Sequence, residues 1–232
     1  MNKLYNGKKI DINFSEIINI LNINGIKYWI CHGTLLGLIR DKQLIPWDHD
    51  IDIAVWSGTI SREKIKKIML SNNFLLKDKH VEDASLTFEK EGGKKVDINF
   101  YQMTTLKNNK RKIAYASYNV PKNFFCRLID ALSNAKKYEG KFKYLINFFS
   151  IFEFFFKKLK NFLISKKNFY HLASYTQPLE LLKEFKDIVF YDINLTVPKK
   201  SEEYLRYVYG ENWKIPKRKF NWIKDSPSTI KK

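Results

Sequence analysis

Apolar and polar positions follow two different periods in the first hundred residues of the chain. Apolar residues recur at three- and four-residue spacing over 14–24 and 60–71, which predicts two helices. Short apolar or alternating runs predict strands over 26–31, 50–56, 74–77, 85–90 and 96–101. Residues 33–42 predict a strand-to-helix turn followed by a short helix. This order of elements is typical of a mixed α/β sheet with flanking helices.

The pattern changes at about residue 121 and is mostly helical from there on. We therefore predict an α+β fold, with a mixed-sheet core in 1–120 and a helical region in 121–232 packed on that core as one structural unit. The longest apolar stretch, 144–156, is too short to span a bilayer. Because the first seventeen residues lack the apolar core of a secretory signal, the sequence predicts a cytoplasmic protein.

Composition narrows the class of protein and of partner. The chain has 232 residues, of which 44% are hydrophobic, and this argues against a disordered protein. Its net charge of +18 favours anionic partners such as nucleotides, nucleic acid or an acidic membrane surface. Cys31 and Cys126 lie far apart, so no disulfide framework or zinc-ligand pattern is present.

Three aspartates stand at alternate positions where the second predicted strand begins. Side chains two residues apart on a strand point to one face, so Asp50 and Asp52 share a face while the aliphatic residues between and after them share the other. Two adjacent carboxylates suit a hard divalent cation, Mg²⁺ or Mn²⁺, that also binds phosphate oxygens. Asp48, in the preceding loop, is a further ligand or a group that orients the loop.

Two other segments extend this candidate site. Asp97 stands between two aliphatic residues on a later strand, where it is a candidate third ligand or a base for an attacking hydroxyl. Gly33 and Thr34 lie at a strand-to-helix turn, where free backbone N–H groups favour an anion. Arg40 and Lys42 follow the predicted helix within reach of a phosphate.

The run GTLLGLIRDKQLIPWDHDIDIAV, residues 33–55, closely resembles the LicD family, which includes bacterial phosphocholine transferases and the fukutin-related proteins. Residues 197–216 are similar to the closing segment of that family, whereas the resemblance over about 105–190 is thin. The resemblance implies a nucleotidyltransferase-like fold for the core. It also implies metal-dependent transfer of a phospho-alcohol from a CDP-linked donor to a sugar hydroxyl of a cell-surface glycan. Phosphocholine is the transferred group that the resemblance favours most.

The same resemblance implies roles for the candidate residues. Asp50, Asp52 and Asp97 would hold the metal with Asp48, and Asp97 would also take the proton of the acceptor hydroxyl. Trp47 would stack on the donor or pack the loop against the core. The partners expected are the CDP-linked alcohol and a glycan or glycolipid acceptor, and the product is CMP.

Lysines and aromatic residues concentrate in one later segment. Residues 136–167 contain nine lysines and two glutamates, and bulky apolar residues recur there at helical spacing. This pattern fits a helix over 141–163 that lies on an anionic membrane surface, or a core helix with a solvated basic face.

Two other functions stay open at this point. One is a nucleotidyltransferase that uses an NTP and acts on RNA or a small molecule, although no RNA-binding module is visible. The other is a non-catalytic, membrane-attached protein of glycan assembly.

Overall fold

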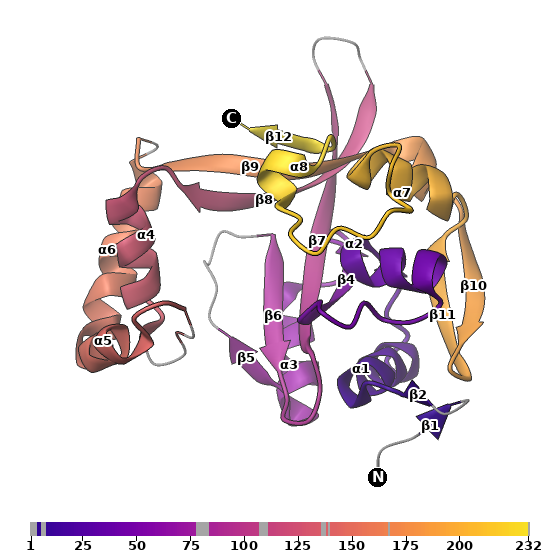
Figure 1. Ribbon diagram of the computed structural model, residues 1–232, viewed down its shortest axis with the longest axis horizontal. Coiled ribbons are helices and arrows are strands. Elements are labelled where there is room, and N and C mark those ends of the chain that lie inside the picture. The colour runs from indigo at the N-terminus through magenta and orange to yellow at the C-terminus, as the bar shows by residue number, and fades with distance from the viewer. Residues whose placement is uncertain are drawn as a thin grey trace. The chain divides into compact units, whose positions relative to one another are not determined.

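The computed structural model describes residues 4–5, 8–77, 84–106, 111–135, 138, 140–166 and 168–231 (Figure 1). The chain forms two compact units. The first comprises Met1–Lys79, Ala84–Ala116 and Tyr175–Ile230, and the second His80–Asp83, Ser117–Ser174 and Lys231–Lys232. The chain passes from the first unit to the second within strand β8 and returns within β9.

A mixed sheet forms the centre of the first unit. Its described strands run in the order β12-β9-β8-β7-β4-β3, with β5 and β6 attached beside β7. β4 and β7 pair in parallel, whereas β3–β4, β5–β6, β6–β7 and β7–β8 are antiparallel. The strand bounds are Trp29–Ile30 (β3), Asp50–Trp56 (β4), Leu75–Lys77 (β5), Ser85–Glu89 (β6), Lys95–Thr105 (β7), Lys112–Pro121 (β8), Tyr170–Pro178 (β9) and Thr229–Lys231 (β12). The predicted mixed sheet with flanking helices is confirmed.

Helices of the first unit begin and end where local chemistry requires. In α1 (Ile12–Ile23), the Asp11 carboxylate caps the first turn by accepting a hydrogen bond from the Phe14 N–H at 3.0 Å. α3 (Arg62–Ser71) has Ser61 as its N-cap. α2 (His32–Leu36) continues directly into a π-helical turn, η1 (Gly37–Asp41). The remaining helices are η4 (Leu179–Leu182), α7 (Ser201–Tyr209) and α8 (Trp222–Asp225).

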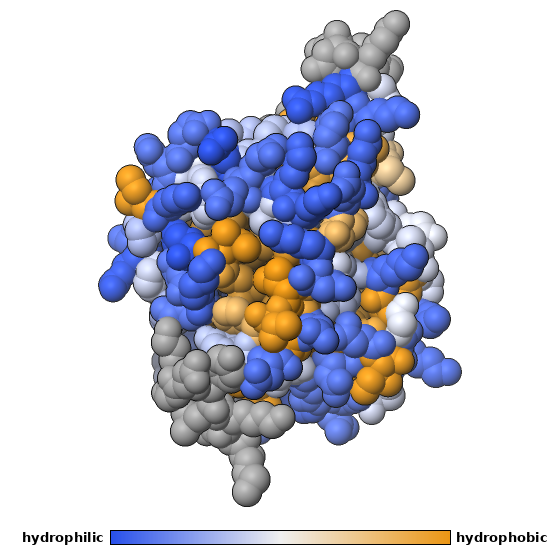
Figure 2. Space-filling model, turned by 90° about the vertical axis from the view of Figure 1, so that its right-hand side faces the viewer, coloured by the Kyte–Doolittle hydropathy of each residue, from blue (hydrophilic) through white to orange (hydrophobic). Residues whose placement is uncertain are grey.

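Two hairpins stand beside this sheet. β10 (Phe185–Phe190) pairs antiparallel with β11 (Ile193–Pro198), and a short pair joins β1 (Leu4–Tyr5) to β2 (Lys8–Lys9). The β10–β11 hairpin lies on the face shown in Figure 2, where apolar side chains gather in the middle and hydrophilic ones surround them. Val189 on β10 is an exposed apolar side chain of this hairpin.

Helices dominate the second unit. They are α4 (Phe124–Leu132), α5 (Lys143–Phe148), the 3₁₀ turn η3 (Phe149–Phe152) and α6 (Glu153–Ser165). Buried side chains of α4, α6 and β9 form its main core: Cys126, Ile129, Leu163, Ile164 and Tyr170. No helix in the described part of the chain is long and apolar enough to cross a membrane.

The prediction of a mostly helical region over 121–232 is not clearly borne out. Helices do occupy most of 124–165, but the strands β9, β10, β11 and β12 follow them. Cys31 and Cys126 are both buried and free, in agreement with the absence of a predicted disulfide.

Candidate active site

The parallel pair β4–β7 builds the candidate site from two alternating sequences. Its register places Asp52 opposite Asp97, and each aspartate has aliphatic neighbours along its strand. These neighbours, Ile51, Ile53, Val96 and Ile98, are completely buried on the other face of the sheet. The apolar face therefore anchors both strands in the core, and the acids are left on the opposite face.

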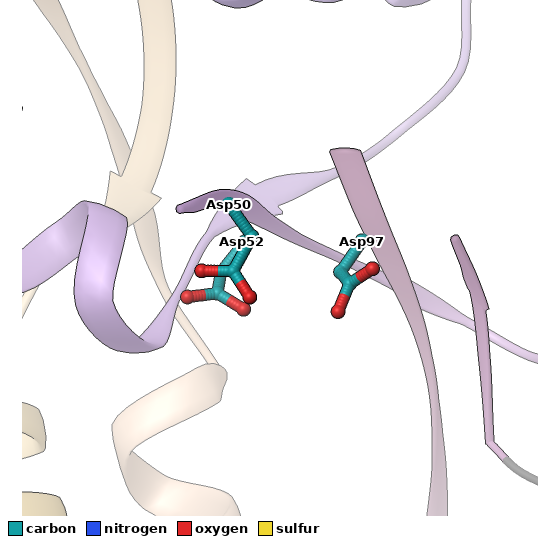
Figure 3. Close-up of side chains that lie close together, drawn as sticks. All are labelled: Asp50, Asp52 and Asp97. Carbon is teal, nitrogen blue, oxygen red and sulfur yellow. The ribbon is translucent and has the colours of Figure 1, made fainter. Parts of the chain in front are cut away.

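Three carboxylates converge there (Figure 3). Asp50, Asp52 and Asp97 each offer an oxygen, all three oxygens lie within 4.8 Å of one another, and each residue is half-buried. Oxygens that bind one Mg²⁺ at about 2.1 Å can be at most about 4.2 Å apart, so small side-chain rotations would bring this set into an ion's first shell. A ligand set made only of carboxylate oxygens suits Mg²⁺ or Mn²⁺ better than a metal that prefers thiolate or imidazole ligands.

The Asp52 carboxylate is held by the turn at the start of α2. Its Oδ2 accepts a hydrogen bond from the Gly33 N–H at 3.0 Å, and the Asp52 N–H donates to Thr34 Oγ1 at 2.8 Å. Burial raises the pKa of Asp52 well above its usual value, and the charges of Asp50, Asp48 and Asp97 raise it further. A divalent cation among these acids would remove that repulsion.

The loop before β4 approaches the same turn closely. A Cβ atom added to Gly33 would collide with the Asp48 carboxylate, so a larger residue here would require that side chain to move. The Lys94 ammonium donates to the Asp48 backbone carbonyl, and Asp48 Oδ1 accepts from the His49 N–H at 3.0 Å. These contacts fix Asp48 near the three acids.

Asp97 has its own support from β6. Thr87 lies opposite Asp97 in the β6–β7 register, and its hydroxyl donates to Asp97 Oδ1 at 2.5 Å. Sequence reasoning did not identify Thr87 or Lys94, because neither residue type carries a signal without knowledge of the strand pairing.

The predicted phosphate ligands have protein partners in this structure. Gly33 and Thr34 bind Asp52, as described above. Arg40 forms a two-point ion pair with Asp41, with both N–O distances 2.7 Å, and Lys42 Nζ donates to the Ile39 carbonyl at 3.0 Å. Contact of any of these groups with phosphate stays a prediction.

Aromatic rings from distant segments lie beside the acids. His32 Nε2 is 2.9 Å from the Tyr101 hydroxyl, and the His32 ring centroid is 4.2 Å from that of Tyr175. Tyr175 in turn stacks on Trp222 at 4.5 Å. Burial lowers the pKa of His32 to about 3, so its imidazole is neutral. Burial raises the pKa of Tyr175 well above its usual value, and the Asp52 charge adds to this shift, which places Tyr175 within electrostatic range of the acids.

A cavity of about 430 Å³ opens in the same unit. Trp47, Tyr209, Trp213 and Phe220 supply its aromatic lining, with the basic residues Arg40 and Lys217 and the acidic residue Asp225. The Arg218 guanidinium lies over Trp47, 5.4 Å from the ring centroid. Burial raises the pKa of the lining residue Tyr209 well above its usual value, and the charges of Asp52 and Asp48 add to the shift.

Comparisons with known proteins agree with this picture. Residues 25–131 match the family model LicD/FKTN/FKRP, nucleotidyltransferase domain. Human ribitol-5-phosphate transferase FKTN is 24% identical over 216 residues, which cover 90% of this chain and 34% of that protein. Human ribitol 5-phosphate transferase FKRP is 38% identical over 40 residues, which cover 17% of this chain and 8% of that protein. The chain therefore aligns with only about a third of the length of FKTN and with less of FKRP.

A solved structure also shows a loose likeness. The lincomycin-bound lincosamide antibiotic adenylyltransferase LnuA superposes with a TM-score of 0.42 and 12% identity, over 88% of this chain and 86% of that chain. The family assignment rests instead on the sequence matches. The predicted resemblance to the LicD family is confirmed, since residues 25–131 match the family model and fukutin is a distant homologue along most of the chain.

Proposed function

We propose that this protein is a metal-dependent phosphotransferase, which moves a phospho-alcohol from a CDP-linked donor to a sugar hydroxyl of a cell-surface glycan and releases CMP. The observation that carries the proposal is the convergence of Asp50, Asp52 and Asp97 on one face of β4 and β7. The match of residues 25–131 to the LicD family model and the homology to proteins named ribitol-phosphate transferases support it.

The acids serve to hold a divalent ion, Mg²⁺ or Mn²⁺. Asp50, Asp52 and Asp97 would bind it, with Asp48 from the neighbouring loop, and the ion would neutralise the donor's diphosphate and polarise its phosphorus. Gly33 and Thr34 position Asp52, and Thr87 positions Asp97. This support restricts the rotation of the carboxylates, as transfer through a charged transition state requires.

Asp97 is our choice for the general base, with a ligand-only role as the alternative. The acceptor hydroxyl oxygen bonds to the phosphorus that carries the alcohol, and its proton passes to the Asp97 carboxylate. The bond from that phosphorus to the bridging oxygen breaks, and CMP leaves with the electron pair. No oxidant, reductant or covalent enzyme intermediate is needed.

The 430 Å³ cavity is our candidate for the donor site. Of the basic residues in the lining, Arg40 is already paired with Asp41, so the charge of the lining does not separate a phosphate from a trimethylammonium group. The carboxylate in the lining, Asp225, is paired with Lys217 at 3.0 Å. Homology to proteins named ribitol-phosphate transferases is our reason to place ribitol phosphate ahead of phosphocholine, which the sequence alone favoured.

Thermal shift with a nucleotide panel tests the proposal. The panel comprises CDP-ribitol, CDP-glycerol, CDP-choline, CMP, ATP and UTP, each with and without Mg²⁺ or Mn²⁺. A ligand that binds only the folded state raises the melting temperature by mass action. A shift with one CDP-alcohol plus metal, lost in Asp52→Ala, is the expected result.

Other outcomes would redirect the assignment. A shift with NTPs alone, followed by pyrophosphate rather than CMP release, would favour the nucleotidyltransferase alternative. Full activity of Asp50→Ala, or full activity in excess EDTA, would refute the metal-dependent mechanism.

A further inference from the structure

Large apolar side chains are exposed far more often in the second unit than elsewhere in the described chain. Thirteen of the twenty-two exposed large apolar residues lie between 124 and 172. Seven of the most exposed lie at 142–155, with exposed fractions of 60–85%: Phe142, Tyr144, Leu145, Phe148, Ile151, Phe154 and Phe155. We call the exposed apolar side chains of 142–155 the aromatic face. A soluble monomer rarely exposes so many large apolar side chains within one short segment.

The elements that carry this face are anchored from their other side. Ile146 of α5 packs with Leu132 and Ala135, and Leu163 and Ile164 of α6 pack with α4. α5, η3 and α6 therefore have a satisfied core side and a second side where aromatic rings meet solvent. Because the core side of these helices is already packed, the exposed rings are not needed for the packing of this unit.

Lysines lie among the exposed rings. Lys143 Nζ is 5.6 Å from the Tyr144 ring centroid, Lys158 Nζ is 4.6 Å from that of Phe154, and Lys166 Nζ is 5.3 Å from that of Phe162. A lysine beside an exposed aromatic ring suits the boundary of a bilayer, where the ring enters the acyl region and the ammonium meets phosphate.

The positive charge of the second unit indicates what kind of surface the aromatic face contacts. Residues 117–174 contain eleven basic and three acidic residues, in a chain whose total charge is +18. Two of these units would repel each other across an interface, and the remainder of the chain is also basic. An anionic surface is complementary to this charge.

We infer that the aromatic face, with Lys143, Lys158 and Lys166, docks the protein on an anionic lipid bilayer, with 142–165 lying in the plane of the membrane surface. This inference goes beyond the transfer reaction and does not depend on it. It assigns the second unit a function that is separate from the acid site of the first unit.

The test is flotation of the full chain with vesicles of phosphatidylcholine alone, or of phosphatidylcholine with phosphatidylglycerol. The wild-type protein should bind the anionic vesicles, and salt should weaken the binding. Phe148→Ser/Ile151→Ser/Phe154→Ser should lower the partition coefficient at least tenfold. The matched control is Ile23→Ser/Leu70→Ser/Val189→Ser, which removes three exposed apolar side chains from the first unit and should bind as wild type.

A second pair of variants tests the charge. Lys143→Gln/Lys158→Gln/Lys166→Gln should lower partitioning to anionic vesicles at least tenfold, since each lysine near such a surface contributes severalfold. The control Lys27→Gln/Lys64→Gln/Lys67→Gln removes the same charge from exposed sites of the first unit and should change binding little.

Hydrogen exchange of the wild-type protein on vesicles completes the test without any substitution. Peptides within 142–165 should gain protection on anionic vesicles. The inference is overturned if wild-type protein does not bind anionic vesicles, if both serine variants lose binding equally, or if protection falls elsewhere. A dimer in analytical ultracentrifugation that Phe148→Ser/Ile151→Ser/Phe154→Ser dissociates would also overturn it, because a second copy would then be the partner.

Discussion

Replacing Asp52 with asparagine should stabilise the metal-free protein while destroying its response to metal. Asparagine keeps an oxygen that can accept the hydrogen bond from the Gly33 N–H, which is 3.0 Å from Asp52 Oδ2. It removes one negative charge from a set whose oxygens lie within 4.8 Å of one another. The substitution therefore separates electrostatic repulsion from local structure.

The size of the effect follows from the same geometry. Two full charges 4.8 Å apart repel by about 3–4 kcal/mol at an effective dielectric constant of about 20. Burial and the neighbouring acids disfavour the charged form of Asp52 and raise its pKa, so this figure is an upper bound on the repulsion that the substitution removes. We therefore expect the free energy of unfolding to rise by about 1–2 kcal/mol, or about 2–8 °C in melting temperature.

The assay is thermal unfolding in EDTA and then in Mg²⁺ or Mn²⁺, with native-state hydrogen exchange of peptides covering β4 to report on this unit. Glu91→Gln, at an exposed acid in the turn between β6 and β7, is the control. It also removes one negative charge from a chain of net charge +18, so it should leave stability unchanged or slightly lower. A metal-free Asp52→Asn protein no more stable than wild type, or one with a full metal-induced shift, would refute the electrostatic account.

Three further substitutions test the support of the site. Gly33→Ala should lower stability by about 1 kcal/mol and reduce the metal-induced shift, because its Cβ would displace the Asp48 carboxylate. Gly58→Ala, where a Cβ meets nothing within 4 Å, should do neither, and equal effects would disprove the steric argument. Thr87→Val should lower kcat with little change in KM and cost about 1 kcal/mol of stability, because Asp97 loses its hydrogen bond. Thr87→Ser should restore kcat, and failure of that rescue would count against the positioning role. The His32 pKa of about 3 lies below its ordinary 6.5, so stability that is present above pH 6.5 is lost as the pH falls toward 3, by up to about 1.4 kcal/mol per pH unit. In denaturant unfolding, the free energy of unfolding of His32→Asn should fall less steeply with decreasing pH than that of the wild type. An unchanged dependence on pH would exclude His32 as its source.

Alternation along the strands made part of the fold predictable. The strands over 50–56 and 95–101 could be recognised because each acid has aliphatic neighbours that need burial, and the structure has β4 and β7 there. The β10–β11 hairpin was missed. Its turn residues, Tyr191 and Asp192, both have positive φ, but they lack the Asn-Gly or Asp-Gly signature by which such turns are recognised.

The site was predictable only where its residues share a strand or a short motif. Asp50 and Asp52 share a face by strand period alone, but the register that sets Asp52 opposite Asp97 depends on a pairing between segments about forty residues apart. Thr87 enters through a third strand, and Tyr175 and Trp222 through the C-terminal part of the first unit. No local pattern could reveal these partners, because loop closure and sheet order determine which of many distant polar and aromatic residues reach the acids.

The cost of the acid cluster argues against a purely structural role. Burial and the charges of Asp50, Asp48 and Asp97 all disfavour an ionised Asp52, and each acts against the stability of the metal-free fold above the ordinary pKa of the group. The apolar face of β4 and β7 offsets this cost, since Ile51, Ile53, Val96 and Ile98 are fully buried behind the acids. A non-catalytic scaffold would gain stability from any of several neutral residues on this face. A cluster that is supported by hydrogen bonds from Gly33 and Thr87, and is unfavourable without a cation, is consistent with the metal-dependent reaction proposed above.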